Sequence, residues 1–310
     1  MRGWFLAAVA WPVAGLVAQA PPGTDVYLAS LKRSGGSVSI GTPANLTHRP
    51  GYDNQPFFAP DGRSILYTVV RPGGPNGTTQ ADIFRLDLAT RNSTPVIETP
   101  ESEYSATLMP GGREISVIRV ERDSTQRLWA FPLDGKGAPR LLLERVKPVG
   151  YQAWLDEKTV GVFVLGSPAT LQVADLATGN ARILLPGIGR ALHRIPGRRA
   201  LSVPQQVADS VWWVMEVDPA TAKATPLVKL LPGAEYYVWL PDGSLLSAQG
   251  NAIFRAIPRG GAANGSRAGA AIRSPAWTRV AIFDHLKTIT RLAVNAGGDR
   301  LAFVAEDGPP

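Results

Sequence analysis

Cysteine is absent from this chain of 310 residues. Its absence excludes disulfides, thiolate metal sites and cysteine nucleophiles. It also excludes a lipid anchor attached to a cysteine at a cleavage point. Without disulfides the folded chain must be held together by its apolar core and its strand pairing, which suits a large closed β architecture.

Histidine is scarce, with three in the whole sequence. His48, His193 and His285 show neither His-Glu-x-x-His nor His-x-His spacing, and a metal site needs three or four ligands in a defined geometry. The segment Gly35-Gly-Ser-Val-Ser39 does not match the Gly-x-Ser-x-Gly motif of serine hydrolases. We therefore expect no catalytic residues, no metal site and no cofactor.

The first twenty residues have the three parts of a secretory signal peptide. Arg2 supplies the positive charge, residues 4–17 form a short apolar stretch, and Ala18-Gln19-Ala20 is an Ala-x-Ala cleavage site. Pro21 disfavours cleavage directly before it, so cleavage after Ala18 and retention as an anchor both stay open. The pattern predicts an exported bacterial protein, periplasmic or secreted.

We accordingly assign residues 1–20 to a signal peptide and 21–310 to one domain. The apolar stretch is short for a membrane-spanning helix, and no other segment is long and apolar enough. The mature protein is therefore expected to have no transmembrane segment.

Glycine and proline recur as punctuation between short apolar runs, which is typical of many strands joined by tight turns. The clearest unit is residues 54–70, followed by strand-like segments at 82–88 and 94–99. Its turn, Pro60-Asp61-Gly62, fits a type I turn because proline presets φ, aspartate bonds back to the backbone and glycine accepts a positive φ.

The same turn returns five more times with altered residues. Its spacing of about 40 to 55 residues is that of four-stranded propeller blades. The later turns are Met109–Arg113, Trp154–Lys158, Ile195–Arg199, Leu240–Ser244 and Asn295–Asp299. Aspartates recur in the turns at Asp61, Asp87, Asp175, Asp218 and Asp242, where Asx turns explain them without a functional role.

The sixth repeat is split between the two ends of the chain. Residues 291–304 supply two strands, while residues 25–31 look like a third strand and 37–47 like a fourth. Joining them closes the ring and pairs edges that would otherwise be exposed. The fold class predicted is all-β: a six-bladed β-propeller of four-stranded antiparallel blades, closed by N- and C-terminal strands that share the last blade.

Two segments resemble a known repeat. Phe58-Ala-Pro-Asp-Gly-Arg-Ser-Ile-Leu-Tyr67 and Trp239-Leu-Pro-Asp-Gly-Ser-Leu-Leu246 are similar to the WD40-like (PD40) repeat of TolB-type β-propellers. The resemblance extends over about residues 24–307 and implies a periplasmic protein-binding scaffold. TolB carries an additional N-terminal α/β domain for which this chain has no room, so the resemblance is to the propeller part only. The resemblance does not imply that this chain binds the partner of TolB, a peptidoglycan-associated lipoprotein.

The chain enters each propeller blade near the central channel, so residues just before each first strand are expected to line one mouth of that channel. They mix carboxylates, tyrosines and arginines, which suits polar and aromatic recognition. The candidate ligand- or partner-binding residues are Asp53, Asn54, Glu103, Tyr104, Tyr151, Arg190, Glu235, Tyr236 and Arg291.

The sequence thus predicts a non-catalytic, monomeric binding propeller whose partner is an envelope protein, a peptide or a small polar ligand. Nucleic acid is not expected, because the chain is exported and has no recognition motif. Two alternatives stay open: a metal-dependent propeller enzyme of the lactonase or polysaccharide lyase type, and a non-catalytic module of a larger envelope protein. Whether the basic stretch 181–300 binds an anionic surface also stays open.

Overall fold

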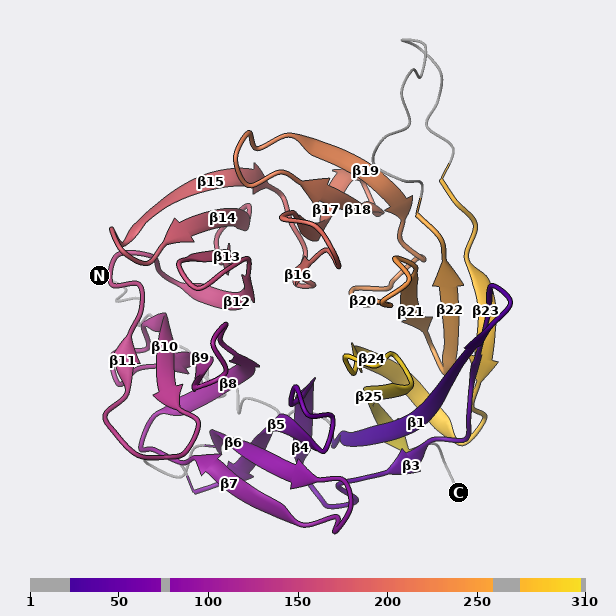
Figure 1. Cartoon of the computed structure of the whole chain (residues 1–310), viewed down its shortest axis with the longest axis horizontal. Helices are drawn as coiled ribbons and strands as arrows, with labels where there is room; N and C mark the ends of the chain where they lie inside the picture. The colour runs from indigo at the N-terminus through magenta and orange to yellow at the C-terminus, as the bar shows by residue number, and fades with distance from the viewer. Residues whose placement is uncertain (1–22, 74–78, 259–273, 308–310) are drawn as a thin grey trace, which may run out of the picture.

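A computed structural model describes residues 23–73, 79–258 and 274–307. The strands form six antiparallel sheets arranged in a ring around a central axis (Figure 1). This confirms the predicted six-bladed β-propeller. The signal peptide predicted for residues 1–20 lies outside the described residues, so that prediction and the domain boundary after it stay predictions.

Five blades are built from consecutive strands, with the first strand of each nearest the axis (Figure 1). Blade 1 contains β4 (Tyr52–Phe58), β5 (Ser64–Pro72), β6 (Thr79–Asp87) and β7 (Ser93–Ile97). Blade 2 contains β8 (Ser102–Leu108), β9 (Glu114–Val120), β10 (Gln126–Pro132) and β11 (Arg140–Leu141). Blade 3 contains β12 (Val149–Trp154), β13 (Thr159–Val164), β14 (Thr170–Asp175) and β15 (Asn180–Pro186). Blade 4 contains β16 (His193–Arg194), β17 (Leu201–Ala208), β18 (Val211–Val217) and β19 (Ala224–Lys229). Blade 5 contains β20 (Tyr237–Trp239), β21 (Leu245–Gln249), β22 (Ala252–Ala256) and β23 (Thr278–Ile282).

The sixth blade joins the two ends of the described chain. Its strands are β24 (Leu286–Val294), β25 (Arg300–Asp307), β1 (Asp25–Ser34), β2 (Ser37–Ile40) and the short β3 (Ala44–Asn45). β1 pairs with β25 in antiparallel register from Asp25 opposite Ala305 to Ser30 opposite Arg300. The ring is therefore closed by main-chain hydrogen bonds between the first and last strands, as the sequence predicts.

The repeated turns have the chemistry expected of them. Asp61 Oδ1 accepts a hydrogen bond from the Arg63 amide, and Asp242 Oδ1 accepts one from the Ser244 amide, both at 2.9 Å. Gly62 has a φ of 64°, a conformation in which a side chain would be strained. The structure thus gives these turn aspartates a local role in the backbone.

Apolar side chains pack in the spaces between adjacent blades, and polar ties cross the same spaces. Tyr237 OH and Trp239 Nε1 of blade 5 donate to Ser202 Oγ of blade 4 at 2.9 and 2.8 Å. Trp154 Nε1 of blade 3 donates to Ser116 Oγ of blade 2 at 2.9 Å. Each hydrogen bond satisfies a polar atom that burial would otherwise leave unpaired, and it joins the first strand of one blade to the second strand of the preceding blade.

The described residues include no helix long and apolar enough to cross a membrane.

Candidate ligand-binding site in the central channel

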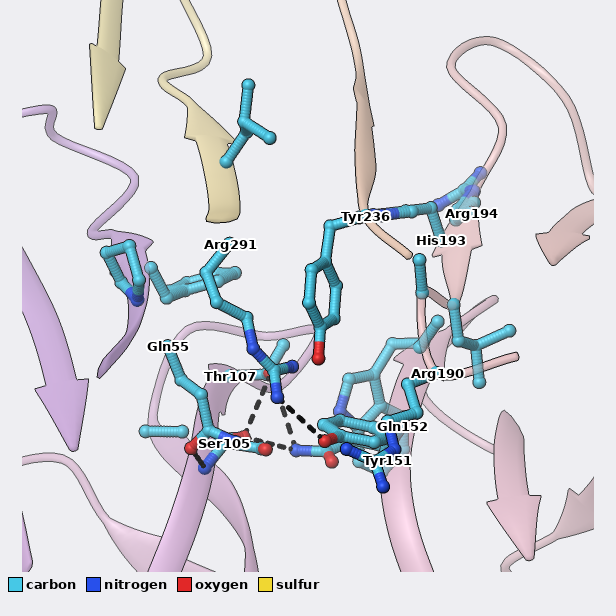
Figure 2. A pocket seen from close by; sticks show the side chains of 18 of the residues that line it. Gln55, Ser105, Thr107, Tyr151, Gln152, Arg190, His193, Arg194, Tyr236 and Arg291 are labelled. Carbon is cyan, nitrogen blue, oxygen red and sulfur yellow. Dashed lines mark hydrogen bonds between the residues drawn. The ribbon is translucent and has the colours of Figure 1, made fainter. Parts of the chain in front are cut away.

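A cavity of about 390 Å³ lies where the innermost strands of all six blades converge. Its wall mixes polar, aromatic and apolar side chains, and the close-up view shows them pointing toward one another from different strands (Figure 2). That volume is within the range of small-molecule sites in proteins.

One structurally equivalent position in each blade supplies a residue to this wall. In blade 1 the amide of Ala59 donates to Ser64 O across the first turn, and the equivalent position is Gln55, four residues before Ala59. The same count from the corresponding turn amide locates the position in every other blade. The six residues at this position are Gln55, Ser105, Tyr151, Ala191, Tyr236 and Arg291, and all of them line the cavity.

An irregularity in the strand turns several of these residues toward the axis. The pairing register shifts around Gln55 in β4, around Ser105 in β8 and around Arg291 in β24. These residues have φ values of 56°, 56° and 51°, a left-handed conformation that is strained for residues other than glycine. β-Bulges of this kind re-aim side chains at functional sites, and here they do so in corresponding places of three blades.

Arg291 is held between two tyrosines contributed by other blades. Its guanidinium carbon is 4.1 Å from the ring centroid of Tyr236 and 5.1 Å from that of Tyr151. Arg291 Nη2 also donates to Tyr151 OH at 2.9 Å (Figure 2). Burial raises the pKa of Tyr236 to about 12, so this phenol is neutral at pH 7. The three side chains thus present a fixed cation on the channel axis.

Arg190 and Arg194 add further positive charge to the wall, and no aspartate or glutamate of the described residues lines it. Burial disfavours the charged form of Arg190, but the neighbouring Tyr151, Tyr236 and Glu235 outweigh it and raise the pKa of the arginine. Arg190 and Arg194 are exposed, so the cavity opens to solvent. The electrostatic character of the site is cationic.

A hydrogen-bond network forms the opposite wall. Gln55 Oε1 accepts from Thr68 Oγ1 and from the Ser105 amide, both at 2.8 Å, which ties blade 1 to blade 2. Gln152 Nε2 donates to Ser105 O at 2.8 Å and to Ser116 O at 3.2 Å, which ties blade 3 to blade 2. Gln152 Oε1 and Ser105 Oγ are buried and have no hydrogen-bond partner among the described residues.

Of the nine residues that the sequence nominates, the structure brings four together in the cavity: Tyr151, Arg190, Tyr236 and Arg291. Two others, Asp53 and Glu103, lie within blades 1 and 2 with fully buried side chains, where Asp53 pairs with Arg49 and Glu103 with Arg119. Burial raises the pKa of both carboxyl groups, against the opposing effect of their partners.

The remaining three nominated residues also lie outside the cavity wall. Asn54 is buried, and its Oδ1 accepts from the Gln55 amide at 2.8 Å. Tyr104 is half-buried against the apolar core between blades 2 and 3. Glu235 is exposed beside Tyr236. Their arrangement gives the cavity no carboxylate.

Sequence reasoning missed several residues of the wall, notably Gln55, Ser105 and Gln152. Counting back from the turn in every blade finds the first two. His193, on β16, also lines the cavity, and its ring lies against that of Tyr237 in a tilted arrangement with the centroids 5.0 Å apart. Burial lowers the pKa of His193 to about 4, so its imidazole is neutral at pH 7. Within the described ranges, no three His, Asp or Glu side chains are grouped closely enough to hold a metal ion.

Comparison with known proteins finds no matching family model and no matching curated protein. Solved structures do match. A protein described as TolB from Agrobacterium tumefaciens aligns with a TM-score of 0.68 at 14% identity, covering 93% of this chain and 99% of the other. TolB from Acinetobacter baumannii aligns with a TM-score of 0.55 at 13% identity, covering 92% and 64%.

An oligogalacturonate lyase in complex with manganese also aligns, with a TM-score of 0.53 at 15% identity, covering 86% of this chain and 80% of the lyase. At these identities the comparisons establish the fold alone. The molecule is a six-bladed β-propeller with a polar cavity on its axis. More narrowly, it has a TolB-like propeller fold, in agreement with the resemblance carried by the Pro-Asp-Gly repeats.

Proposed function

We propose that this protein is an exported, non-catalytic binding propeller that takes a segment of an envelope protein, a peptide or a small polar ligand at the mouth of its central channel. The observation that supports this most is the cavity itself, because all six blades contribute to its wall. Similarity to TolB structures agrees with a binding role, and the signal-like N-terminus agrees with a periplasmic or secreted location.

The cavity is suited to recognition because its polar groups are already held in place. Arg291 is fixed by two aromatic rings and a hydrogen bond. Gln55 and Gln152 are fixed by bonds to neighbouring blades. A site whose side chains are ordered before binding loses less conformational entropy when the ligand arrives.

The cysteine-free sequence allows the channel mouth to be blocked selectively. Arg190→Cys places a single thiol on the exposed rim of the cavity, where a polyethylene glycol maleimide would obstruct entry. Arg113→Cys places the same label on the β8–β9 turn, at the opposite end of a channel-lining strand, and serves as the matched control. The immobilised full chain is then exposed to bacterial envelope extract, and the retained proteins and peptides are quantified by mass spectrometry.

We expect the label at position 190, and not the label at position 113, to abolish retention of a defined subset of components. Equal retention by both labelled proteins would refute binding at the mouth. Metal analysis of the unlabelled protein separates this proposal from the rival hypothesis of a metal-dependent propeller enzyme, which the fold similarity to a manganese-bound lyase raises. A stoichiometric, tightly held metal ion would overturn the scaffold proposal in favour of the enzyme.

A further inference from the structure

The wall of the cavity holds no described carboxylate to pair with its positive charge, and Glu235, which lies outside the wall beside Tyr236, is the acidic neighbour of Arg190. The charge comes from Arg190, Arg194 and Arg291, which line the wall. Other arginines of this protein do have acidic partners, such as Arg119 with Glu103 and Arg255 with Asp242. An arginine offers five N–H donors, and Arg291 uses one of them on Tyr151. The wall therefore holds unused donors suited to an anion.

An unused acceptor lies in the same wall. Gln152 is 7% exposed, and its Nε2 is within hydrogen-bond reach of oxygen atoms of Ser105, Thr107 and Ser116, which fixes the orientation of the amide. Its Oε1 has no partner among the described residues, and neither has the adjacent Ser105 Oγ. A buried acceptor without a donor destabilises a folded protein, and a ligand that donates to it would remove that penalty.

Together these features describe a ligand in which an anion and a hydrogen-bond donor are neighbours. We propose that the cavity binds the α-carboxylate at the C-terminal end of a peptide chain. This inference rests on the proposed binding function. Arg190 and Arg291 pair with the carboxylate, and the last peptide N–H donates to Gln152 Oε1. Ser105 Oγ supplies a further hydrogen bond to the same chain end.

The acceptor is what favours a chain end over a phosphate. A phosphate monoester dianion presents only acceptor oxygens, so it would leave Gln152 Oε1 unpaired and repel it. In a peptide the terminal carboxylate and the last N–H are attached to the same α-carbon, so one group meets both requirements. The exposed Arg190 marks the open side of the cavity, through which the rest of the chain would extend to solvent.

The test uses a library of N-acetylated hexapeptides with randomised C-terminal residues, synthesised once as free acids and once as amides. Both forms are applied to the immobilised full chain, and retained peptides are measured by mass spectrometry. We expect the free acids to be retained about tenfold or more over the amides. N-acetyl amino acids are added as competitors, to distinguish binding of a longer chain end from binding of any small acid.

Arg291→Gln and Arg190→Gln should each reduce the preference for free acids, whereas Arg113→Gln, at an exposed turn arginine, should preserve it. Free acids and amides retained equally, with retention still lost in Tyr236→Ala, would overturn the carboxylate proposal and leave channel binding intact. If N-acetyl amino acids at equal concentration displaced the peptides completely, the proposal that the ligand is a peptide C-terminus would be overturned in favour of a small carboxylic acid. Retention unaffected by every cavity variant would overturn both this inference and the proposed function.

Discussion

Arg291 of blade 6 lies against the face of Tyr236 of blade 5, with 4.1 Å between the guanidinium carbon and the ring centroid. The two residues occupy equivalent positions in their blades, four residues before the start of the first turn. The pair thus joins two blades at the channel axis and presents the cation to the cavity.

Replacing the aromatic face should weaken binding more than folding. In Tyr236→Leu the apolar volume is largely kept, but the ring quadrupole that holds Arg291 is lost. We expect retention of free-acid hexapeptides to fall about threefold to tenfold. Tyr104→Leu is the matched control, because Tyr104 lies outside the cavity wall. An equal fall in both variants would show that the loss is not specific to the cavity.

Ser105→Ala should stabilise the protein while weakening the ligand site. The change removes a buried hydroxyl that has no partner among the described residues and keeps the Cβ, so the left-handed backbone is unchanged. We expect the free energy of unfolding in urea to rise by about 1 kcal/mol, and peptide retention to fall. A variant that is less stable than the wild type would show that this hydroxyl is hydrogen-bonded in the native protein.

The buried ion pair in blade 2 should show strong coupling. Glu103 is fully buried, and Arg119 Nε donates to its Oε1 at 2.9 Å. Arg119→Met leaves that carboxylate without its cation, which should lower the free energy of unfolding by about 3–5 kcal/mol. The double variant Glu103→Leu/Arg119→Met should recover most of this loss. A double-mutant cycle measured by urea unfolding checks it, and simple additivity would contradict the assigned pairing.

His193 should make stability depend on pH. Burial lowers its pKa to about 4 in the folded protein, from 6.5 when unperturbed, so unfolding takes up a proton between these values. Its contribution to stability is therefore fully present above about pH 6.5 and is lost as the pH falls toward 4. The full loss amounts to about 3 kcal/mol. His193→Gln should flatten this part of the profile in urea unfolding from pH 7.5 to 4.5 (about three pH units). Parallel profiles would contradict the assignment.

Much of the fold is predictable because turn chemistry is local. The backbone of Pro60-Asp61-Gly62 and of Pro241-Asp242-Gly243 is specified by the proline, the Asx hydrogen bond and the glycine. This turn chemistry identifies the repeat even where the surrounding residues differ. The split sixth blade follows from counting strands at both ends. The pairing of β1 with β25 bears out that count.

The candidate site was less predictable because it depends on bulges. The sequence nominates the residues just before each first strand, which reaches Tyr151, Tyr236 and Arg291 but stops one residue short of Gln55 and Ser105. A bulge displaces the side chains that follow it. Gln55 and Ser105 have positive φ values although neither is a glycine, so the sequence does not indicate a bulge at these positions.

The burial of two carboxylates also made the candidate site hard to predict from the sequence. Asp53 and Glu103 look like mouth residues because they are charged, yet their partners Arg49 and Arg119 allow them to sit inside the blades. Arg119 comes from the neighbouring strand and Arg49 from the loop before β4. A single sequence does not reveal the pair of Glu103 with Arg119, because it arises from the register of β8 against β9, and the four-residue spacing of Arg49 and Asp53 does not by itself indicate that Asp53 is buried.

The account depends most on the closed ring, since the cavity has its six-sided wall only if β1 completes the last blade. Ser30 and Arg300 are both exposed and directly opposite on β1 and β25. The flanking bond from the Leu31 amide to Asp299 O makes theirs a non-hydrogen-bonded pair, whose Cα separation suits a disulfide.

The most direct test is therefore oxidation of Ser30→Cys/Arg300→Cys in this otherwise cysteine-free chain. The account predicts a quantitative intramolecular disulfide, detected as the loss of two hydrogen atoms in the intact mass and faster migration on a non-reducing gel, and a higher unfolding temperature. Ser30→Cys/Arg113→Cys, with thiols in blades that are not neighbours, should stay reduced. Free thiols in the first protein while it remains folded, or equal cross-linking in both, would contradict the closed ring and the channel site built on it.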